Sequence, residues 1–398
     1  MPSSPAPPIP AATATPVPSA ASPRRDAPLP APDPGAGPGL AEADLLLHTD
    51  LLGDLVVPGG AARSAELAAL AARAAVYATR ARGDGTRRVY RSAWRGYAAW
   101  CQSLGRAPLA GDPELLAMYA TRRADAGVAV STLRVDLAAI RTAHLLAGIP
   151  LDLRDPRLAL VMEGITRGRG VRPVRQATPA VPDVLRRLLA ACPPASAALG
   201  ARDRAMLLLG FGAALRRSEL VALQRGDVEL VAGRGLRVLV RRSKTDPYGH
   251  GQEVAVWANP GDPLLCPVAA LDGWLRHRAQ AGDLDGPAPE GAHRTRPLFC
   301  AVTKAGRATG AALSDKAVAR LVKGAAARAG LDPARYSGHS LRAGLATAAG
   351  DAGAALPDLM RQTRHKSTQV ALAYLRPADL WRNNVTKRVF ATTPDIDE

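Results

Sequence analysis

Scarce residue types exclude several classes of protein for this chain of 398 residues. Cysteine occurs only four times, with no Cys-x-x-Cys spacing and no histidine pair at the spacing of zinc ligands. This pattern argues against a disulfide framework and against a structural zinc site. The longest apolar run, Ala205 to Leu215, has eleven residues. Because this run is too short to span a bilayer, it predicts a buried helix.

Other sequence signals are also missing. The chain begins Met-Pro-Ser-Ser-Pro, without the basic and then apolar segments of a signal peptide. No Gly-x-x-x-x-Gly-Lys loop occurs, so we do not expect use of ATP. No cluster of acids suits a pair of metal ions. These absences predict an intracellular protein with no membrane span, no metal site and no small-molecule cofactor.

Negative charge is in short supply. The chain has 52 lysines and arginines but only 35 acids, which gives a net charge of +17. Only six of the basic residues are lysines, so nearly all the positive charge is arginine. Residues 1–63 contain three arginines and six acids, so the rest of the chain carries a net charge of +20. A basic chain of this size is expected to bind a polyanion, and nucleic acid is the first candidate.

The chain is predicted to begin with two segments of different character. Residues 1–63 are a tail rich in Pro and Ala that we expect to be disordered, apart from a short leucine-rich patch. Residues 64–165 have helical periodicity and predict a small all-helical domain, with one helix starting near Asp112-Pro113, one capped by Ser131 and one starting near Asp155-Pro156. An aromatic stripe in the first helix is interpreted as core packing rather than as a surface for stacked bases. The stripe comprises Tyr90, Trp94, Tyr97 and Cys101.

Arginines are concentrated at two places in this half of the chain. One group lies on the face of the first helix opposite the aromatic stripe, and the other lies in residues 166–180, a segment without acids. We predict that residues 166–180 are a flexible basic linker that follows a phosphate backbone, with a solvated linker as the alternative. Both groups are candidate DNA contacts: Arg87, Arg88, Arg91, Arg95, Arg167, Arg169, Arg172 and Arg175.

Residues 181–398 have a mixed pattern. Strands are predicted at 227–231, Leu236 to Arg241 and Glu253 to Trp257, and turn residues between the last two predict a hairpin. Everything after the hairpin is predicted to be helical. The expected fold is therefore mainly α, of the α+β class, with one small antiparallel sheet. One predicted helix starts at Pro182. The other predicted helices span 202–215, 267–280, 314–329 with Ser314 as cap, 340–352, 357–363, 368–376 and 378–390.

Four short motifs in this region carry cationic residues, and one tyrosine follows them. The motifs are A-L-R-R-S-E-L, R-S-K-T-D at the hairpin tip, H-S-L-R, and R-H-K-S followed by A-Y-L. Each has a purely structural alternative, such as an ion pair between Arg216 and Glu219 or a core role for Tyr374. Taken together, two arginines, a lysine, two histidines and a tyrosine are what metal-free attack on a phosphodiester requires.

Together the motifs resemble those of the tyrosine recombinases of the phage-integrase type. The resemblance covers residues 64–390, with 64–165 similar to the core-binding, DNA-binding domain of the family and 181–398 containing its catalytic domain. The residue before the second histidine is often glycine in the family, whereas this chain has Arg364. The resemblance implies a supporting acid, Glu219, and a catalytic set of Arg216, Lys244, His339, Arg342, His365 and Tyr374.

The resemblance also implies a mechanism. Both arginines neutralise the non-bridging oxygens of the phosphate, and His365 donates a hydrogen bond to them. Tyr374 is the nucleophile, His339 accepts its proton, and Lys244 protonates the leaving 5′ oxygen. The product is a 3′-phosphotyrosine link, which a free 5′-hydroxyl from another strand reverses without metal or ATP.

The expected partners are double-stranded DNA and further copies of the chain. By resemblance, the predicted helix at 378–390 docks on a neighbouring protomer and closes a homo-tetramer on paired sites. The expected location is the cytoplasm, in association with the nucleoid. A type IB topoisomerase, which shares this chemistry, is one alternative. A DNA-binding protein that no longer cuts is another, although binding alone would need neither Tyr374 nor Lys244.

Overall fold

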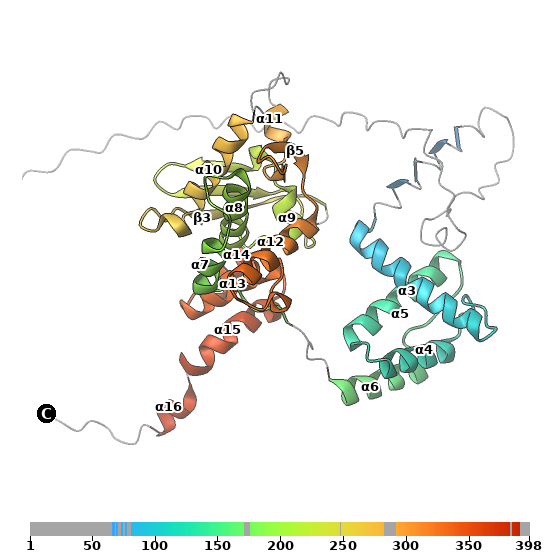
Figure 1. Ribbon diagram of the computed structural model, residues 1–398. Coiled ribbons are helices and arrows are strands. Elements are labelled where there is room, and N and C mark those ends of the chain that lie inside the picture. The colour runs from blue at the N-terminus through green and yellow to red at the C-terminus, as the bar shows by residue number, and fades with distance from the viewer. Residues whose placement is uncertain are drawn as a thin grey trace, which may run out of the picture. The chain divides into compact units, whose positions relative to one another are not determined.

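The computed structural model describes residues 66–67, 69–70, 73–74, 76–77, 81–170, 176–246, 248–281, 292–382 and 384–390 (Figure 1). The predicted tail at 1–63 lies outside these residues, as do Arg172 and Arg175. The chain divides into two compact units. One comprises the described residues up to Leu116 with Val135–Asp155, and the other comprises Ala117–Arg134 with the described residues from Pro156 onward. The predicted domain boundaries stay predictions.

Helices α3 (Asp84–Ser103), α4 (Pro113–Asp125), α5 (Val130–Leu146) and α6 (Pro156–Arg169) lie between residues 84 and 169. The aromatic stripe of α3 is a core feature, because Trp94 and Tyr97 are each 1% exposed. The ring of Trp94 meets His144 of α5 edge-on, with the centroids 6.2 Å apart. The prediction of core packing is therefore confirmed for these side chains.

The predicted start of α4 is confirmed, whereas the predicted cap of α5 is wrong. Asp112 caps α4, since its Oδ1 accepts a hydrogen bond from the N–H of Glu114 at 2.8 Å. The prediction that Ser131 caps the next helix was wrong, because α5 already includes Val130.

The predicted linker at 166–180 is more ordered at both ends than expected. Helix α6 continues to Arg169, so Arg167 and Arg169 are helical, and Arg167 pairs with Glu163 at 2.6 Å. At the other end, the N–H of Thr178 donates to the carbonyl of Arg335 at 2.8 Å, and that of Ala180 to the carbonyl of Ser340 at 2.9 Å. The prediction of a flexible connector was wrong for these residues.

Residues 176–390 combine helices with two small antiparallel sheets. The first sheet has the order β1-β2-β3, and the second pairs β4 with β5. The strands are β1 (Val228–Val231), β2 (Gly235–Val240), β3 (Gln252–Trp257), β4 (Cys300–Val302) and β5 (Ala308–Ala312). The helices are α7 (Pro182–Ala190), α8 (Ala198–Gly212), α9 (Arg217–Ala222), α10 (Pro267–Gln280), α11 (Ala292–Thr295), α12 (Asp315–Arg328), α13 (His339–Asp351), α14 (Leu356–Thr363), α15 (Thr368–Arg382) and α16 (Val385–Phe390), with 3-10 turns at Arg225–Asp227, Pro263–Leu265 and Pro333–Arg335.

This architecture confirms the predicted fold class and corrects two details. A second sheet is present, although everything after the first hairpin was predicted to be helical. The predicted break between 368–376 and 378–390 is also wrong, because α15 runs unbroken from Thr368 to Arg382 and α16 is a separate short helix. No helix in the described ranges is long and apolar enough to cross a membrane.

Two hydrophobic clusters position the elements that carry the candidate site. The larger one packs the apolar helix α8 against α10, α12 and one face of the first sheet, with Trp274 and Phe299 fully buried. Leu341 of α13 belongs to this cluster, so the start of α13 is fixed beside α8. The smaller cluster joins α13, α14 and α15 through Ala346, Leu359 and Leu375.

Close backbone packing holds α13 against the segment before α7. A Cβ added at Gly344 would lie 2.2 Å from the carbonyl oxygen of Ala180, whereas a Cβ at Gly273 of α10 would meet no atom within 4 Å. We expect Gly344→Ala to lower the free energy of unfolding by about 1–3 kcal/mol through overpacking. Gly273→Ala should raise it by roughly 0.5–1 kcal/mol, because alanine favours a helix interior.

Urea unfolding of the two variants beside the parent chain measures both effects. A stabilising Gly344→Ala would contradict the close approach of α13 to residue 180.

Candidate active site

The C-terminus of α8 sets the geometry of the candidate site. The N–H groups of Ala214 and Leu215 donate to the carbonyls of Phe211 and Gly210 at 2.9 and 3.0 Å, which is the Schellman pattern that ends a helix. Ala214 adopts a left-handed conformation with φ 47°, although it is not glycine. The free carbonyls at this helix end carry the negative pole of the dipole of α8, which favours nearby cations.

Arg216 follows this turn and is held by Glu219. The Oε2 atom of Glu219 accepts the backbone N–H of Arg216 at 2.9 Å, and its Oε1 accepts Nη1 of the same arginine at 2.6 Å. Glu219 is 4% exposed. Burial acts to raise the pKa of Glu219, but the Arg216 N–H and the guanidinium of Arg364 outweigh it and hold this pKa below its ordinary value. Glu219 is therefore a buried anion.

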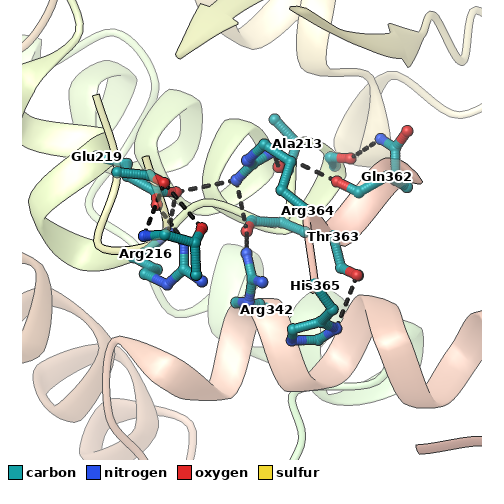
Figure 2. A network of polar contacts seen from close by, with 12 residues as sticks. Ala213, Arg216, Glu219, Arg342, Gln362, Thr363, Arg364 and His365 are labelled. Carbon is teal, nitrogen blue, oxygen red and sulfur yellow. Dashed lines mark hydrogen bonds and ion pairs between the residues drawn. The ribbon is translucent and has the colours of Figure 1, made fainter. Parts of the chain in front are cut away.

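Arg364 reaches the same carboxylate from the end of α14 (Figure 2). Its Nη2 donates to Oε2 of Glu219 at 2.9 Å and to the carbonyl of Ala214 at 3.1 Å, and its Nη1 donates to the carbonyl of Ala213 at 2.9 Å. The backbone of Arg364 is left-handed, with φ 56° and ψ 40°. This arginine therefore joins α14, Glu219 and the end of α8.

Arg342 of α13 completes the arginine cluster and retains an unused donor. Its Nη1 donates to the carbonyl of Ala214 at 2.7 Å. Its Nη2 is buried and has no hydrogen-bond partner in the part of the chain that the structure describes. Burial, with the charges of Arg216 and Arg364, lowers the pKa of Arg342 to about 10, so the guanidinium stays charged at neutral pH. A buried charged N–H without a partner is costly, and an incoming oxyanion would satisfy it.

Tyr374 lies between the two histidines. Its hydroxyl oxygen is 3.3 Å from Nε2 of His339, at the start of α13. Its ring stacks on that of His365, with the centroids 5.7 Å apart and an angle of 12° between the planes. The contact between α13 and α15 thus brings a phenol, an imidazole and Arg342 together from distant parts of the sequence.

The protonation states of this trio suit a proton transfer. Burial raises the pKa of Tyr374, although the charge of Arg342 opposes it, so the phenol is protonated at neutral pH. Desolvation, and then the charges of Arg342 and Arg216, lower the pKa of His339. A neutral imidazole therefore faces a protonated phenol, and it can accept the phenolic proton.

Lys244 is separate from the other five predicted catalytic residues. It lies in the turn between β2 and β3, where Ser243 and Asp246 exchange backbone hydrogen bonds at 3.2 and 3.1 Å. Its side chain is exposed and makes no hydrogen bond or ion pair with any described residue. The structure thus brings together Arg216, His339, Arg342, His365 and Tyr374, with Glu219 supporting them, and leaves Lys244 on the hairpin.

The predicted DNA contacts fall into three groups. Arg88, Arg95 and Arg169 are exposed, and Arg167 is exposed within its pair with Glu163. Arg87 and Arg91 are half-buried on α3. The others, Arg172 and Arg175, lie outside the described residues. The part of these arginines in DNA binding stays a prediction. Within the described ranges, no three His, Cys, Asp or Glu side chains lie together as a metal site.

Two residues of the site were not predicted to contribute. Arg364 was noted only as a departure from glycine, and that departure was the one signal available in the sequence. Gln362 gave no signal, yet its Nε2 donates to the carbonyls of Gly212 and Ala255 at 2.7 and 3.0 Å and so ties α14 to α8 and β3. Both depend on carbonyls more than one hundred positions away along the chain.

Comparison with known proteins identifies relatives of the whole catalytic region. The sequence model of the phage integrase family matches residues 181–380. The integrase/recombinase xerD homolog of Selenomonas ruminantium is 32% identical over 314 residues, which cover 78% of this chain and 87% of that protein. Recombinase cre of Escherichia phage P1 is 25% identical over 304 residues, which cover 72% of this chain and 82% of that protein.

A solved structure shares the fold at low sequence identity. It is the XerH site-specific recombinase bound to palindromic difH substrate in a post-cleavage complex, with a TM-score of 0.55 and 16% identity. The match covers 86% of this chain and 95% of that chain.

The buried ion pair between Arg364 and Glu219 leads to a prediction about stability. Removing one partner of a buried pair costs about 3–5 kcal/mol, and relief of the left-handed backbone returns about 1 kcal/mol. We therefore expect Arg364→Gly to lower the free energy of unfolding by roughly 2–4 kcal/mol in urea titrations. Combining it with Glu219→Gln should cost less than the sum of the two single changes, because the partners are coupled.

Arg361→Ala, in the same helix, is the matched control. Arg361 pairs with Asp358 on the surface, where its side chain is 77% exposed, so its loss should cost no more than about 1 kcal/mol. Equal effects of the two substitutions would refute the special place of Arg364.

Proposed function

Since the chain belongs to the phage integrase family of tyrosine recombinases, we propose that the cluster around Tyr374 is its active site for cutting and rejoining DNA. Enzymes of this family act as site-specific recombinases through a phosphotyrosine intermediate, and this chain is one of them. Relatives that are recombinases favour this activity over a type IB topoisomerase and over a protein that only binds DNA.

One observation carries the assignment of residues. The hydroxyl of Tyr374 lies 3.3 Å from Nε2 of His339, beside the buried guanidinium of Arg342, whose Nη2 has no partner among the described residues. A nucleophile, a base and an unsatisfied cation in one place suit attack on a phosphodiester.

Charge governs the first part of the proposed mechanism. Attack on a phosphodiester builds negative charge on the non-bridging oxygens, and preorganised cations stabilise it. Arg216 and Arg342 each offer guanidinium donors to these oxygens. The cluster contains the arginines Arg216, Arg342 and Arg364. The carboxylate of Glu219 is hydrogen-bonded to Arg216 and Arg364 and is shared between them. The cluster therefore keeps a positive excess for the phosphate.

Proton transfer governs the second part. His339 takes the proton of Tyr374 as the phenolic oxygen attacks phosphorus, and the bond to the 5′ oxygen breaks. We propose that Lys244, carried by the hairpin, protonates that oxygen when DNA is bound. A 5′-hydroxyl from another strand then attacks the phosphotyrosine, releases Tyr374 and joins the strands.

The assembly and the place of action are also proposed. Exchange between two sites needs four cleavages, so we propose a homo-tetramer on paired double-stranded sites, assembled through α16. The DNA substrate implies work on the nucleoid in the cytoplasm. The arginines of α3 and of the predicted linker are proposed as phosphate contacts.

Tyr374→Phe should abolish covalent protein–DNA adducts and leave DNA binding unchanged, because it removes one hydroxyl and no charge. A nicked duplex that carries a site selected by binding from a random pool is the substrate, and a protease-sensitive shifted band is the readout. Because Tyr374 contacts His339 of its own chain, a mixture of Tyr374→Phe and Arg342→Gln should also form no adduct. Adducts in that mixture would mean that the tyrosine is supplied by a neighbouring protomer.

Lys244→Ala should slow single-turnover cleavage by about 10²–10⁴-fold, the usual contribution of a general acid. Replacing the 5′ bridging oxygen by sulfur removes the need for a proton donor, because a thiol has a pKa of about 8.5 and an alcohol a far higher one. The variant should therefore be largely rescued on that substrate.

Arg216→Ala is the control for this experiment, since its charge acts on the non-bridging oxygens, which the sulfur leaves unchanged. Equal defects of Lys244→Ala on oxygen and on sulfur would show that Lys244 only binds a phosphate.

Helix α16 presents apolar side chains to solvent: Val385, Val389 and Phe390 are 70%, 64% and 76% exposed. We expect deletion of residues 384–398 to preserve binding to a single site and to impair assembly on paired sites. Native gel shifts with one and two sites measure both. Unchanged recombination by the truncated chain would rule out this part of the assembly.

A further inference from the structure

Thr363, the last residue of α14, makes two short contacts through one hydroxyl. The side chain is fully buried. Its Oγ1 lies 2.6 Å from the carbonyl oxygen of Leu359 and 2.9 Å from Nδ1 of His365 (Figure 2). His365 is thus held by a hydroxyl on the side of the ring that carries Nδ1.

Counting protons fixes the tautomer of His365. A hydroxyl has one proton and a carbonyl oxygen has none. Two oxygens 2.6 Å apart repel each other unless a proton lies between them, so the proton of Thr363 is committed to Leu359. The contact between Oγ1 and Nδ1 then requires a proton on Nδ1. The neutral ring of His365 therefore carries its proton on Nδ1 and a lone pair on Nε2.

This tautomer conflicts with the hydrogen bond to the phosphate oxygens that the family resemblance implies for His365. A ring with a bare Nε2 can accept a hydrogen bond there but cannot donate one to a phosphate oxygen. Resting on the proposed function, we infer that Thr363 is a positioning residue that keeps neutral His365 in the Nδ1–H form, so that His365 takes up a proton on Nε2 when the scissile phosphate binds. The proton comes from solvent, no DNA bond changes in this step, and the proton leaves when the DNA leaves.

The surroundings of His365 explain why the uptake waits for the phosphate. Arg342 and His339 face the ring from α13, Arg216 from the turn before α9, Arg364 from the end of α14 and the ring of Tyr374 from α15. Burial, and then these positive groups, lower the pKa of His365 to about 4. A bound phosphodiester adds negative charge beside the same nitrogen, which favours the imidazolium form.

The tautomer can be measured without DNA. Long-range ¹H–¹⁵N correlations of the histidine rings in the full chain distinguish a protonated Nδ1 from a protonated Nε2. We expect the Nδ1–H form for His365 in the free protein and in Thr363→Ser, which keeps the hydroxyl. Thr363→Val removes the hydroxyl and should move the ring toward the Nε2–H form. An Nε2–H ring in the free parent chain would overturn the inference, as would an unchanged tautomer in Thr363→Val.

Proton uptake is tested with dimethyl phosphate, a diester that stays a monoanion across the working range. Saturation with this probe should raise the titration midpoint of His365 from about 4 to near neutrality, a rise of about three pH units, in the parent chain and in Thr363→Ser. A ring that becomes Nε2–H while it remains neutral would overturn the proposed uptake. Circular dichroism of each variant establishes that it is folded. If Thr363→Val does not fold, the tautomer and the midpoint shift of His365 in the parent chain and in Thr363→Ser test the inference.

A second readout follows from the same linkage. A group whose pKa is raised in the complex stabilises that complex below the raised pKa. This stabilisation is lost as the pH rises through the raised pKa. Single-turnover cleavage should therefore fall with rising pH in the parent chain and in Thr363→Ser, and this alkaline limb should weaken in Thr363→Val. Failure of the proposed function would instead appear as missing Tyr374 adducts at every pH, with the tautomer of His365 unaffected.

Discussion

One buried carboxylate, that of Glu219, holds the catalytic region in register. It binds the backbone and guanidinium of Arg216 on one side and the guanidinium of Arg364 on the other. Because Arg364 and Arg342 also share the carbonyl of Ala214, the end of α8, the start of α9, α13 and the end of α14 are joined through a few atoms. Two chain segments with left-handed backbone, at Ala214 and Arg364, are kept in place by these bonds.

The network also explains the departure from the glycine that is frequent in the family. A glycine would reach the left-handed conformation without strain, but it would leave one side of the Glu219 carboxylate uncompensated inside the protein. Arginine accepts the backbone strain and supplies the counter-charge, since its Nη2 lies 2.9 Å from the carboxylate. The turn before His365 is therefore fixed by the side chain of Arg364, whereas a glycine would adopt this turn without any side chain to fix it.

Residues with local signals were predictable from the sequence, and residues with distant partners were not. The prediction of a helix at 267–280 agrees with α10, because proline begins it and apolar periodicity continues it. Strand β5, A-T-G-A-A, has little intrinsic strand preference and forms only because β4 pairs with it. The motifs contain the residues that the fold brings together near Tyr374, among them His339 and His365, but also Lys244, which the structure leaves on the hairpin. They could not reveal Arg364, whose anion lies 145 positions away.

The arrangement of charge gives the site its preference for an anion. Glu219 is the carboxylate hydrogen-bonded within the cluster, and both of its oxygens are engaged by Arg216 and Arg364. It acts on Arg342 only through its charge, and the remaining donor of Arg342 is buried without a hydrogen-bond partner among the described residues. Burial, and then the same positive excess, lowers the pKa of both histidines, so that His339 is neutral, as the proposed base requires, and His365 is neutral until a phosphate arrives. Glu219 thus stabilises the arginines but leaves one donor of Arg342 unpaired, and in the proposed mechanism the free energy gained on pairing that donor goes to binding of the DNA backbone.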